Sequence, residues 1–137
     1  MRIECEYVSA SSAGDEIFQV LFESVEEQYD EPYLLIQRAW LEEDESEFSP
    51  IYVETHNRDL IGHYPTVEAV LTRNHLTLRL PAPANEVIDV DFKASDANFH
   101  EVSRMLGIIL FNDTIDHEHE DANNAPGTYF RKSKTTP

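Results

Sequence analysis

The chain has 137 residues, 41% of them hydrophobic, so it is long enough to bury a single core without a disulfide or metal. Ten basic residues stand against 27 acidic ones, which gives a formal net charge of −17 at pH 7. A field of that sign repels nucleic acid and anionic lipid and attracts a basic partner. It therefore excludes a nucleic-acid-binding or membrane-surface role, although acidity that serves only solubility is an equal alternative.

Cysteine usage and the N-terminal sequence point to the cytoplasm. Cys5 is the single cysteine, so no internal disulfide can form, which fits a reducing compartment. Residues 1–6 carry two acids where a signal peptide needs basic and apolar residues. No apolar run approaches the ~18 residues that cross a membrane. We expect a soluble, cytoplasmic protein with no membrane partner.

The first ninety or so residues alternate in the manner of β-strands. The strand predicted over 2–8 places Ile3, Cys5 and Tyr7 on one face. A second strand is predicted over 17–22. In residues 33–41, odd-numbered and even-numbered positions both carry apolar residues, which indicates a central strand that is covered on both faces. Further predictions are an acidic connection at 24–32, an exposed acidic loop at 42–47 and a short strand at 51–55.

Residues 66–80 predict a β-hairpin with a defined register. Arg73-Asn74 forms a two-residue turn in which asparagine tolerates positive φ. If Thr72 opposes His75, the apolar residues of both strands share one side. On the other side, Glu68 lies opposite Arg79, which is a favourable cross-strand pair.

The pattern after the hairpin predicts one more strand and then a helix. Residues 87–92 alternate, with Asp89 and Asp91 on the exposed side and Asp89 within reach of Arg79. Ser95 is a candidate N-cap. The helix that it begins carries an apolar stripe of Phe99, Val102, Leu106, Ile109 and Leu110.

These elements predict an α+β fold: a mainly antiparallel β-sheet of about six or seven strands, with one C-terminal amphipathic helix packed on its apolar face. One domain spans 1–113. Residues 114–137 have few apolar residues and no period, so we expect a flexible tail that is acidic first and basic at its end.

Several groups of residues are compatible with chemistry, but each has a simpler structural explanation. His56, His63 and Tyr64 share a loop with Asp59, yet nothing in the sequence supplies a pocket or an oriented partner for acid–base catalysis. Residues 116–121 hold metal-compatible side chains in a charge run without the spacing of a zinc site. No phosphate loop or catalytic triad is present. We therefore predict no enzyme activity, cofactor or metal.

The candidate binding residues are acidic. The first choice is the acidic loop beside Trp40, which comprises Glu42, Glu43, Asp44, Glu45 and Glu47. Trp40 itself is an interface candidate only if it is exposed, because tryptophan is more often a core residue. The second choice is Asp89 and Asp91, whose spacing aligns their side chains on one strand face, although an ordinary exposed sheet face beside Arg79 is the favoured explanation.

The order of segments resembles the immunity protein 10 family of bacterial polymorphic toxin systems over roughly residues 7–111. The segments that carry the resemblance are Pro32–Arg38, Tyr52–Glu54, the loop with Gly62, Val67-Glu68, the hairpin Leu71–Leu80, Ile88–Phe92 and the closing helix. The resemblance implies a cytoplasmic antidote that binds and blocks a cognate toxin domain and has no active site. It carries over no contact residues.

Three functional hypotheses follow. The first is a toxin-neutralising protein whose acidic surface steers it to a basic toxin domain, such as a nuclease. The second is an acidic nucleic-acid mimic or regulator that binds several basic proteins. The third is a small enzyme that uses His56, His63 or the acidic pair. The sequence leaves the choice between monomer and dimer open.

Overall fold

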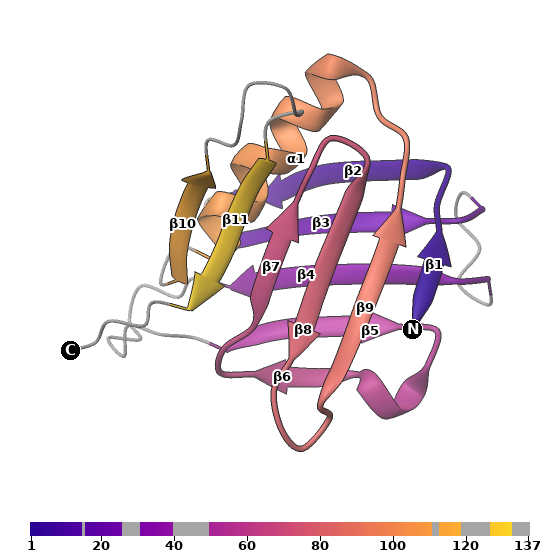
Figure 1. Ribbon diagram of the computed structural model, residues 1–137, viewed down its shortest axis with the longest axis vertical. Helices are drawn as coiled ribbons and strands as arrows, with labels where there is room; N and C mark the ends of the chain where they lie inside the picture. The colour runs from indigo at the N-terminus through magenta and orange to yellow at the C-terminus, as the bar shows by residue number, and fades with distance from the viewer. Residues whose placement is uncertain (15, 26–30, 40–49, 111–112, 119–126, 133–137) are drawn as a thin grey trace.

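The computed structural model describes residues 1–14, 16–25, 31–39, 50–110, 113–118 and 127–132, with side chains described up to residue 110. It confirms the α+β fold (Figure 1). The described residues form eleven strands, one α-helix and one short 3-10 helix, and the strands belong to two sheets instead of one.

A six-stranded sheet, called the front sheet because it faces the viewer in Figure 1, contains the predicted hairpin. Its strand order is β1-β9-β8-β7-β11-β10, and every pairing is antiparallel except that of β1 with β9. The strands are β1 (Arg2–Glu4), β7 (Glu68–Leu71), β8 (His75–Leu80), β9 (Glu86–Asp91), β10 (Asp113–Glu118) and β11 (Gly127–Lys132).

A five-stranded antiparallel sheet, called the back sheet, lies behind it in the order β2-β3-β4-β5-β6. The central strand predicted over 33–41 is β4, which lies in the middle of this sheet. The strands are β2 (Tyr7–Ala13), β3 (Ile17–Glu23), β4 (Tyr33–Ala39), β5 (Ile51–Thr55) and β6 (Gly62–Tyr64), with the 3-10 helix η1 (Arg58–Leu60) between the last two.

The main core lies between the two sheets. The strands of the sheets cross in Figure 1, and inward-facing aliphatic side chains of both fill the space between them. Phe22 of β3 and Phe92, which follows β9, are both buried, and their ring centroids lie 5.3 Å apart. The back sheet therefore covers the apolar face of the front sheet, which the prediction assigned to the helix alone.

Residues 2–8, which the alternation predicts as one strand, are divided between the two sheets. The backbone N–H of Cys5 donates to β9 at 2.8 Å, whereas the N–H of Glu6 donates to β3 at 3.1 Å. The chain crosses from the front sheet to the back sheet at this point, and the alternation is interrupted. Ile3 and Cys5 are buried as predicted, but Tyr7 is 45% exposed, so its predicted inward position is wrong.

The predicted hairpin is confirmed in its register. Glu68 pairs with Arg79 and Leu71 with Leu76, and the N–H of Thr72 donates to the carbonyl of His75 at 2.8 Å. The apolar side chains on the predicted inward side, Ala69 and Leu71 of β7 and Leu76, Leu78 and Leu80 of β8, are buried in the core.

The predicted helix is α1 (Asp96–Ile109), and its N-cap is Ser95, whose side chain accepts a hydrogen bond from the N–H of Asn98. The helix packs mainly against β2 and β3 of the back sheet, and three turns of its apolar stripe join the core. At its C-terminus, buried Arg38 of β4 donates to the carbonyl of Ile109 at 2.6 Å. A guanidinium there satisfies a free carbonyl and complements the negative end of the helix dipole.

The C-terminal segment differs from the flexible tail predicted for 114–137. The backbone of 113–118 and 127–132 forms β10 and β11, and β11 extends the front sheet by pairing with β7. Strand pairing to an existing sheet edge needs only backbone donors and acceptors, so the low apolar content of this segment concealed it. No helix among the described residues is long and apolar enough to cross a bilayer.

The fold predicts a large stability loss on truncation of the inter-sheet core. We expect Phe22→Ala to lower the free energy of unfolding by about 3–5 kcal/mol, because it leaves a cavity against Phe92. Val25→Ala, at a side chain that is 39% exposed, is the control and should change it by less than about 0.5 kcal/mol. Urea denaturation measures both, and equal effects would contradict the described core.

Candidate functional site

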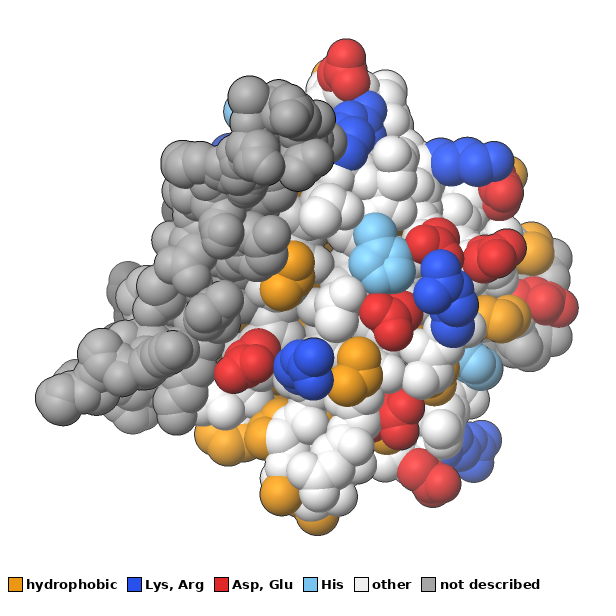
Figure 2. All heavy atoms as spheres, viewed as in Figure 1, with side chains coloured by type: hydrophobic (Ala, Val, Ile, Leu, Met, Phe, Trp, Pro, Cys, Tyr) orange, Lys and Arg blue, Asp and Glu red, His pale blue; other side chains and the backbone are white. Residues whose placement is uncertain are grey.

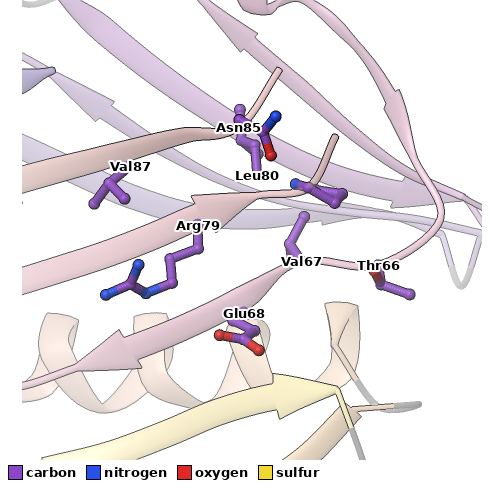
Figure 3. A pocket seen from close by; sticks show the side chains of 8 residues that line it. Thr66, Val67, Glu68, Arg79, Leu80, Asn85 and Val87 are labelled. Atoms are coloured by element: carbon purple, nitrogen blue, oxygen red, sulfur yellow. The ribbon is translucent and has the colours of Figure 1, made fainter. Parts of the chain in front are cut away.

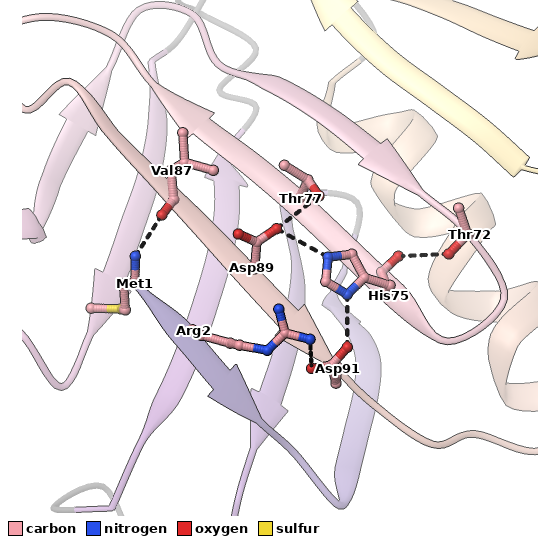
Figure 4. Close-up of polar contacts among 8 residues, drawn as sticks. All are labelled: Met1, Arg2, Thr72, His75, Thr77, Val87, Asp89 and Asp91. Carbon is pink, nitrogen blue, oxygen red and sulfur yellow. Dashed lines mark hydrogen bonds and ion pairs between the residues drawn. The ribbon is translucent and has the colours of Figure 1, made fainter.

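Polar side chains of three neighbouring strands meet on the outer face of the front sheet (Figure 4). They include both members of the predicted acidic pair. We call this group the His75 cluster, and its members are Arg2 of β1, His75 and Thr77 of β8, and Asp89 and Asp91 of β9.

His75 lies between the two carboxylates and bonds to both. Its Nδ1 is 2.8 Å from Oδ1 of Asp91, and its Nε2 is 3.0 Å from Oδ1 of Asp89. The ring therefore bridges the two carboxylates and links β8 to β9.

Two further donors complete the cluster. Thr77 donates its hydroxyl to Asp89 at 3.1 Å, and Arg2 donates Nη2 to Oδ2 of Asp91 at 2.7 Å. Hydrogen bonding from His75 is the largest cause that lowers the pKa of Asp89 and that of Asp91 below the usual 3.8. Partial burial opposes both shifts. Both carboxylates are thus held ionised by fixed partners.

The turn between β8 and β9 sets the register that builds the cluster. Asn85 has a φ of 48°, and its N–H donates to the carbonyl of Pro81 at 3.0 Å. Asparagine tolerates this left-handed conformation better than most residues. The turn brings β9 back antiparallel, with His75 directly opposite Asp91. The predicted reach of Asp89 to Arg79 is wrong, because Thr77 lies opposite Asp89.

Carboxylates and basic side chains are interspersed on this face (Figure 2). Its carboxylates alternate with cations across β1, β9, β8 and β7, so no continuous acidic patch forms on these four strands. The outward-facing charged groups are four carboxylates (Glu4, Glu68, Asp89 and Asp91), two guanidinium groups (Arg2 and Arg79) and the imidazole of His75.

A shallow hollow of about 350 Å³ lies on the same face, toward the β8–β9 turn (Figure 3). Glu68, Arg79, Leu80 and Val87 are among its lining residues. Glu68 and Arg79 stand opposite each other as predicted, but Arg79 forms no ion pair within the described residues. Among the described residues that line the hollow, Arg79 has no second cation beside it that would complete an anion site.

The acidic loop, which was the first predicted binding site, lies outside the described residues. This holds for Trp40, Glu42, Glu43, Asp44, Glu45 and Glu47. The described structure gives the two points that the loop joins: the end of β4 at Ala39 and Pro50 just before β5. Ala39 pairs with Ile17 at the start of β3, so the β2–β3 turn, with Glu16, is at the same end of the back sheet.

The predicted histidine loop lies away from the His75 cluster. His63 belongs to β6 of the back sheet, and its ring centroid is 5.1 Å from that of Tyr52. His56 follows β5, with its ring centroid 6.5 Å from that of Tyr33. Tyr64 is buried and donates its hydroxyl to the carbonyl of Leu60. Tyr33 and Tyr52 both donate to the carboxylate of Glu54 at 2.7 Å, so His56 and His63 flank one tyrosine–glutamate group, which buried Tyr64 does not join.

Cys5 is a buried core residue, as predicted. Burial, followed by the nearby carboxylate of Glu23, raises the pKa of its thiol to about 12. A thiol with so high a pKa holds almost no thiolate near neutral pH, so it is a poor nucleophile.

Comparisons with known proteins identify no relative. The chain matches no family model, no curated protein and no solved structure. The resemblance to the immunity protein 10 family therefore stays a prediction.

The His75 cluster predicts a stability difference that depends on pH. The pKa values of Asp89 and Asp91 are lowered in the folded state, so their ionised forms stabilise the fold at any pH above their usual pKa of 3.8. This stabilisation is lost as the pH falls through the lowered pKa values. We expect Asp89→Asn combined with Asp91→Asn to lower the free energy of unfolding at about pH 6, and the deficit to shrink at about pH 3.

Urea denaturation at both pH values measures this difference. Glu16→Gln serves as the control, because Glu16 is exposed and forms no ion pair within the described residues. A deficit that is the same at both pH values would show that the carboxylates of the cluster do not stabilise the fold through their charge.

Proposed function

We propose that this protein is a binding protein that neutralises a basic partner, and that the partner is a bacterial toxin domain. The observation that carries the proposal is the uneven distribution of charge. On the four described strands that form the outer face around the His75 cluster, cations accompany the carboxylates. The two connections at the ends of β4, residues 26–30 and 40–49, contain eight acids and no lysine or arginine.

An excess of acidic residues without lysine or arginine, as in these two connections, suits electrostatic steering. Carboxylates without neighbouring cations project a field into solvent, whereas those paired with histidine and arginine largely cancel it. Steering of this kind raises the association rate with a basic partner, and contacts at short range then decide selectivity. We therefore keep residues 40–47 as the primary docking segment and lower the rank of Asp89 and Asp91.

The chemistry of the described clusters supports binding over catalysis. Both ring nitrogens of His75 are engaged by carboxylates, so neither is free to exchange a proton with a substrate. The cluster instead links β1, β8 and β9. The choice of a toxin domain as the partner, and of the cytoplasm as the site of action, rests on the resemblance in the arrangement of segments.

The direct test uses the C-terminal domain of a large secreted protein encoded next to this one. We expect that domain to bind the full chain in a pull-down, and co-expression to protect cells from its toxicity. Binding to several unrelated basic proteins with similar affinity would instead favour the nucleic-acid mimic. No binding and no protection would contradict the toxin proposal.

Neutralising the acidic loop tests the docking segment. We expect Glu42→Gln, Glu43→Gln, Asp44→Asn, Glu45→Gln and Glu47→Gln together to slow association with that domain about tenfold or more at low salt, and to flatten its salt dependence. The control is Asp89→Asn with Asp91→Asn, which should lower the free energy of unfolding but leave the association rate nearly unchanged. Surface-based binding kinetics measure both, and an unchanged rate for the loop variant would rule out the loop as the steering element.

A further inference from the structure

Four strands lie at the sheet edges of the described structure, and three of them carry features that discourage pairing. β1 and β6 have only three residues each, and β1 carries Arg2 and Glu4. β10 contains three acids in six residues. Short length and charge are the usual means by which edge strands avoid pairing with other chains.

The fourth edge, β2, has neither feature. It is seven residues long, YVSASSA, without a charged residue or a proline. It borders the back sheet, where only β3 pairs with it (Figure 1). Helix α1 packs on the inner side, with the core, and the outward-facing side chains Tyr7, Ser9, Ser11 and Ala13 are all exposed.

The pairing pattern shows which backbone groups of β2 remain open. The N–H of Ser24 donates to the carbonyl of Pro32, which directly precedes β4, so alternation directs the backbone of Ile17, Gln19, Leu21 and Glu23 toward β2. In β2, the odd-numbered residues bond to these four residues. The backbone N–H and carbonyl groups of Val8, Ala10 and Ser12 therefore point away from β3.

One of these three positions is already engaged, since the carbonyl of Val8 accepts a hydrogen bond from Nδ2 of Asn98 at 2.8 Å. The outward groups of Ala10 and Ser12 make no hydrogen bond within the described residues.

We propose that β2 pairs antiparallel with β2 of a second copy of this chain, around a two-fold axis at Ser11. Ala10 of each copy then faces Ser12 of the other, which forms four backbone hydrogen bonds and leaves the bond of Asn98 intact. The back sheets of the two copies join into one sheet. An interface of this symmetry must complement itself, and the pairing places no charge opposite a like charge within residues 9–13.

The absence of charge on β2 fits a second copy as the occupant. Two chains of net charge −17 repel each other over most of their surfaces, so they can approach only where the surface carries no charge. β2 meets this condition over its whole length. Glu6 and Glu16 flank the paired segment, so added salt screens their repulsion and strengthens the dimer.

The first experiment measures the oligomeric state of the full chain by sedimentation equilibrium. We expect a dimer that becomes tighter as salt rises. Ala10→Pro removes an N–H that faces away from β3, so it should yield a folded monomer. Ser11→Glu places two carboxylates opposite each other across the axis and should weaken the dimer at least tenfold. Gln19→Glu adds the same charge one strand inward and is the matched control, which should remain dimeric.

The second experiment locates the axis. Residues opposite each other in a non-hydrogen-bonded pair have Cα atoms about 4.5 Å apart, which a disulfide can bridge. Ser11→Cys should therefore form a covalent dimer under mild oxidation, whereas wild-type chain, with buried Cys5, should not. A wild-type chain that stays monomeric, or a dimer that Ala10→Pro and Ser11→Glu leave unchanged, would overturn the proposal. Either result is independent of toxin binding.

Discussion

The described structure depends on the register of β8 with the two strands beside it. β8 is bonded to β7 on one side and to β9 on the other, and its side chains alternate between the core and solvent. Leu76, Leu78 and Leu80 therefore enter the core, while His75 and Thr77 reach the carboxylates of β9. A slip of one residue would exchange the two sets, so the same two turns fix both the core and the His75 cluster.

The acidic residues of the chain fall into two groups. Asp89 and Asp91 each accept hydrogen bonds from neighbouring side chains of β1 or β8. The eight acids at 26–30 and 40–49 have no lysine or arginine within their own segments. The net charge of −17 does not distinguish these two groups.

Local patterns in the sequence predicted the α+β class, the β7–β8 hairpin and helix α1, because turn chemistry and side-chain period specify them within a few residues. The same reasoning, extended across the Pro81–Asn85 turn, would have placed His75 opposite Asp91. The contact of Arg2 could not be found in this way, since the parallel pairing of β1 with β9 spans most of the chain. The strands after residue 113 join the front sheet through the pairing of β11 with distant β7. The back sheet pairs only consecutive strands, and its separation from the front sheet depends on packing between the two sheets.

The edges of the two sheets determine what kind of assembly the fold permits. If β2 paired with a different edge of the next molecule, each contact would leave another β2 free and an open fibre would grow. Each of the other described edges is either short or acidic, so none matches a seven-residue uncharged strand. A two-fold pairing of β2 with itself uses both copies of the open edge and leaves none for a third chain. The distribution of charge among the edges therefore favours a closed dimer and opposes further growth.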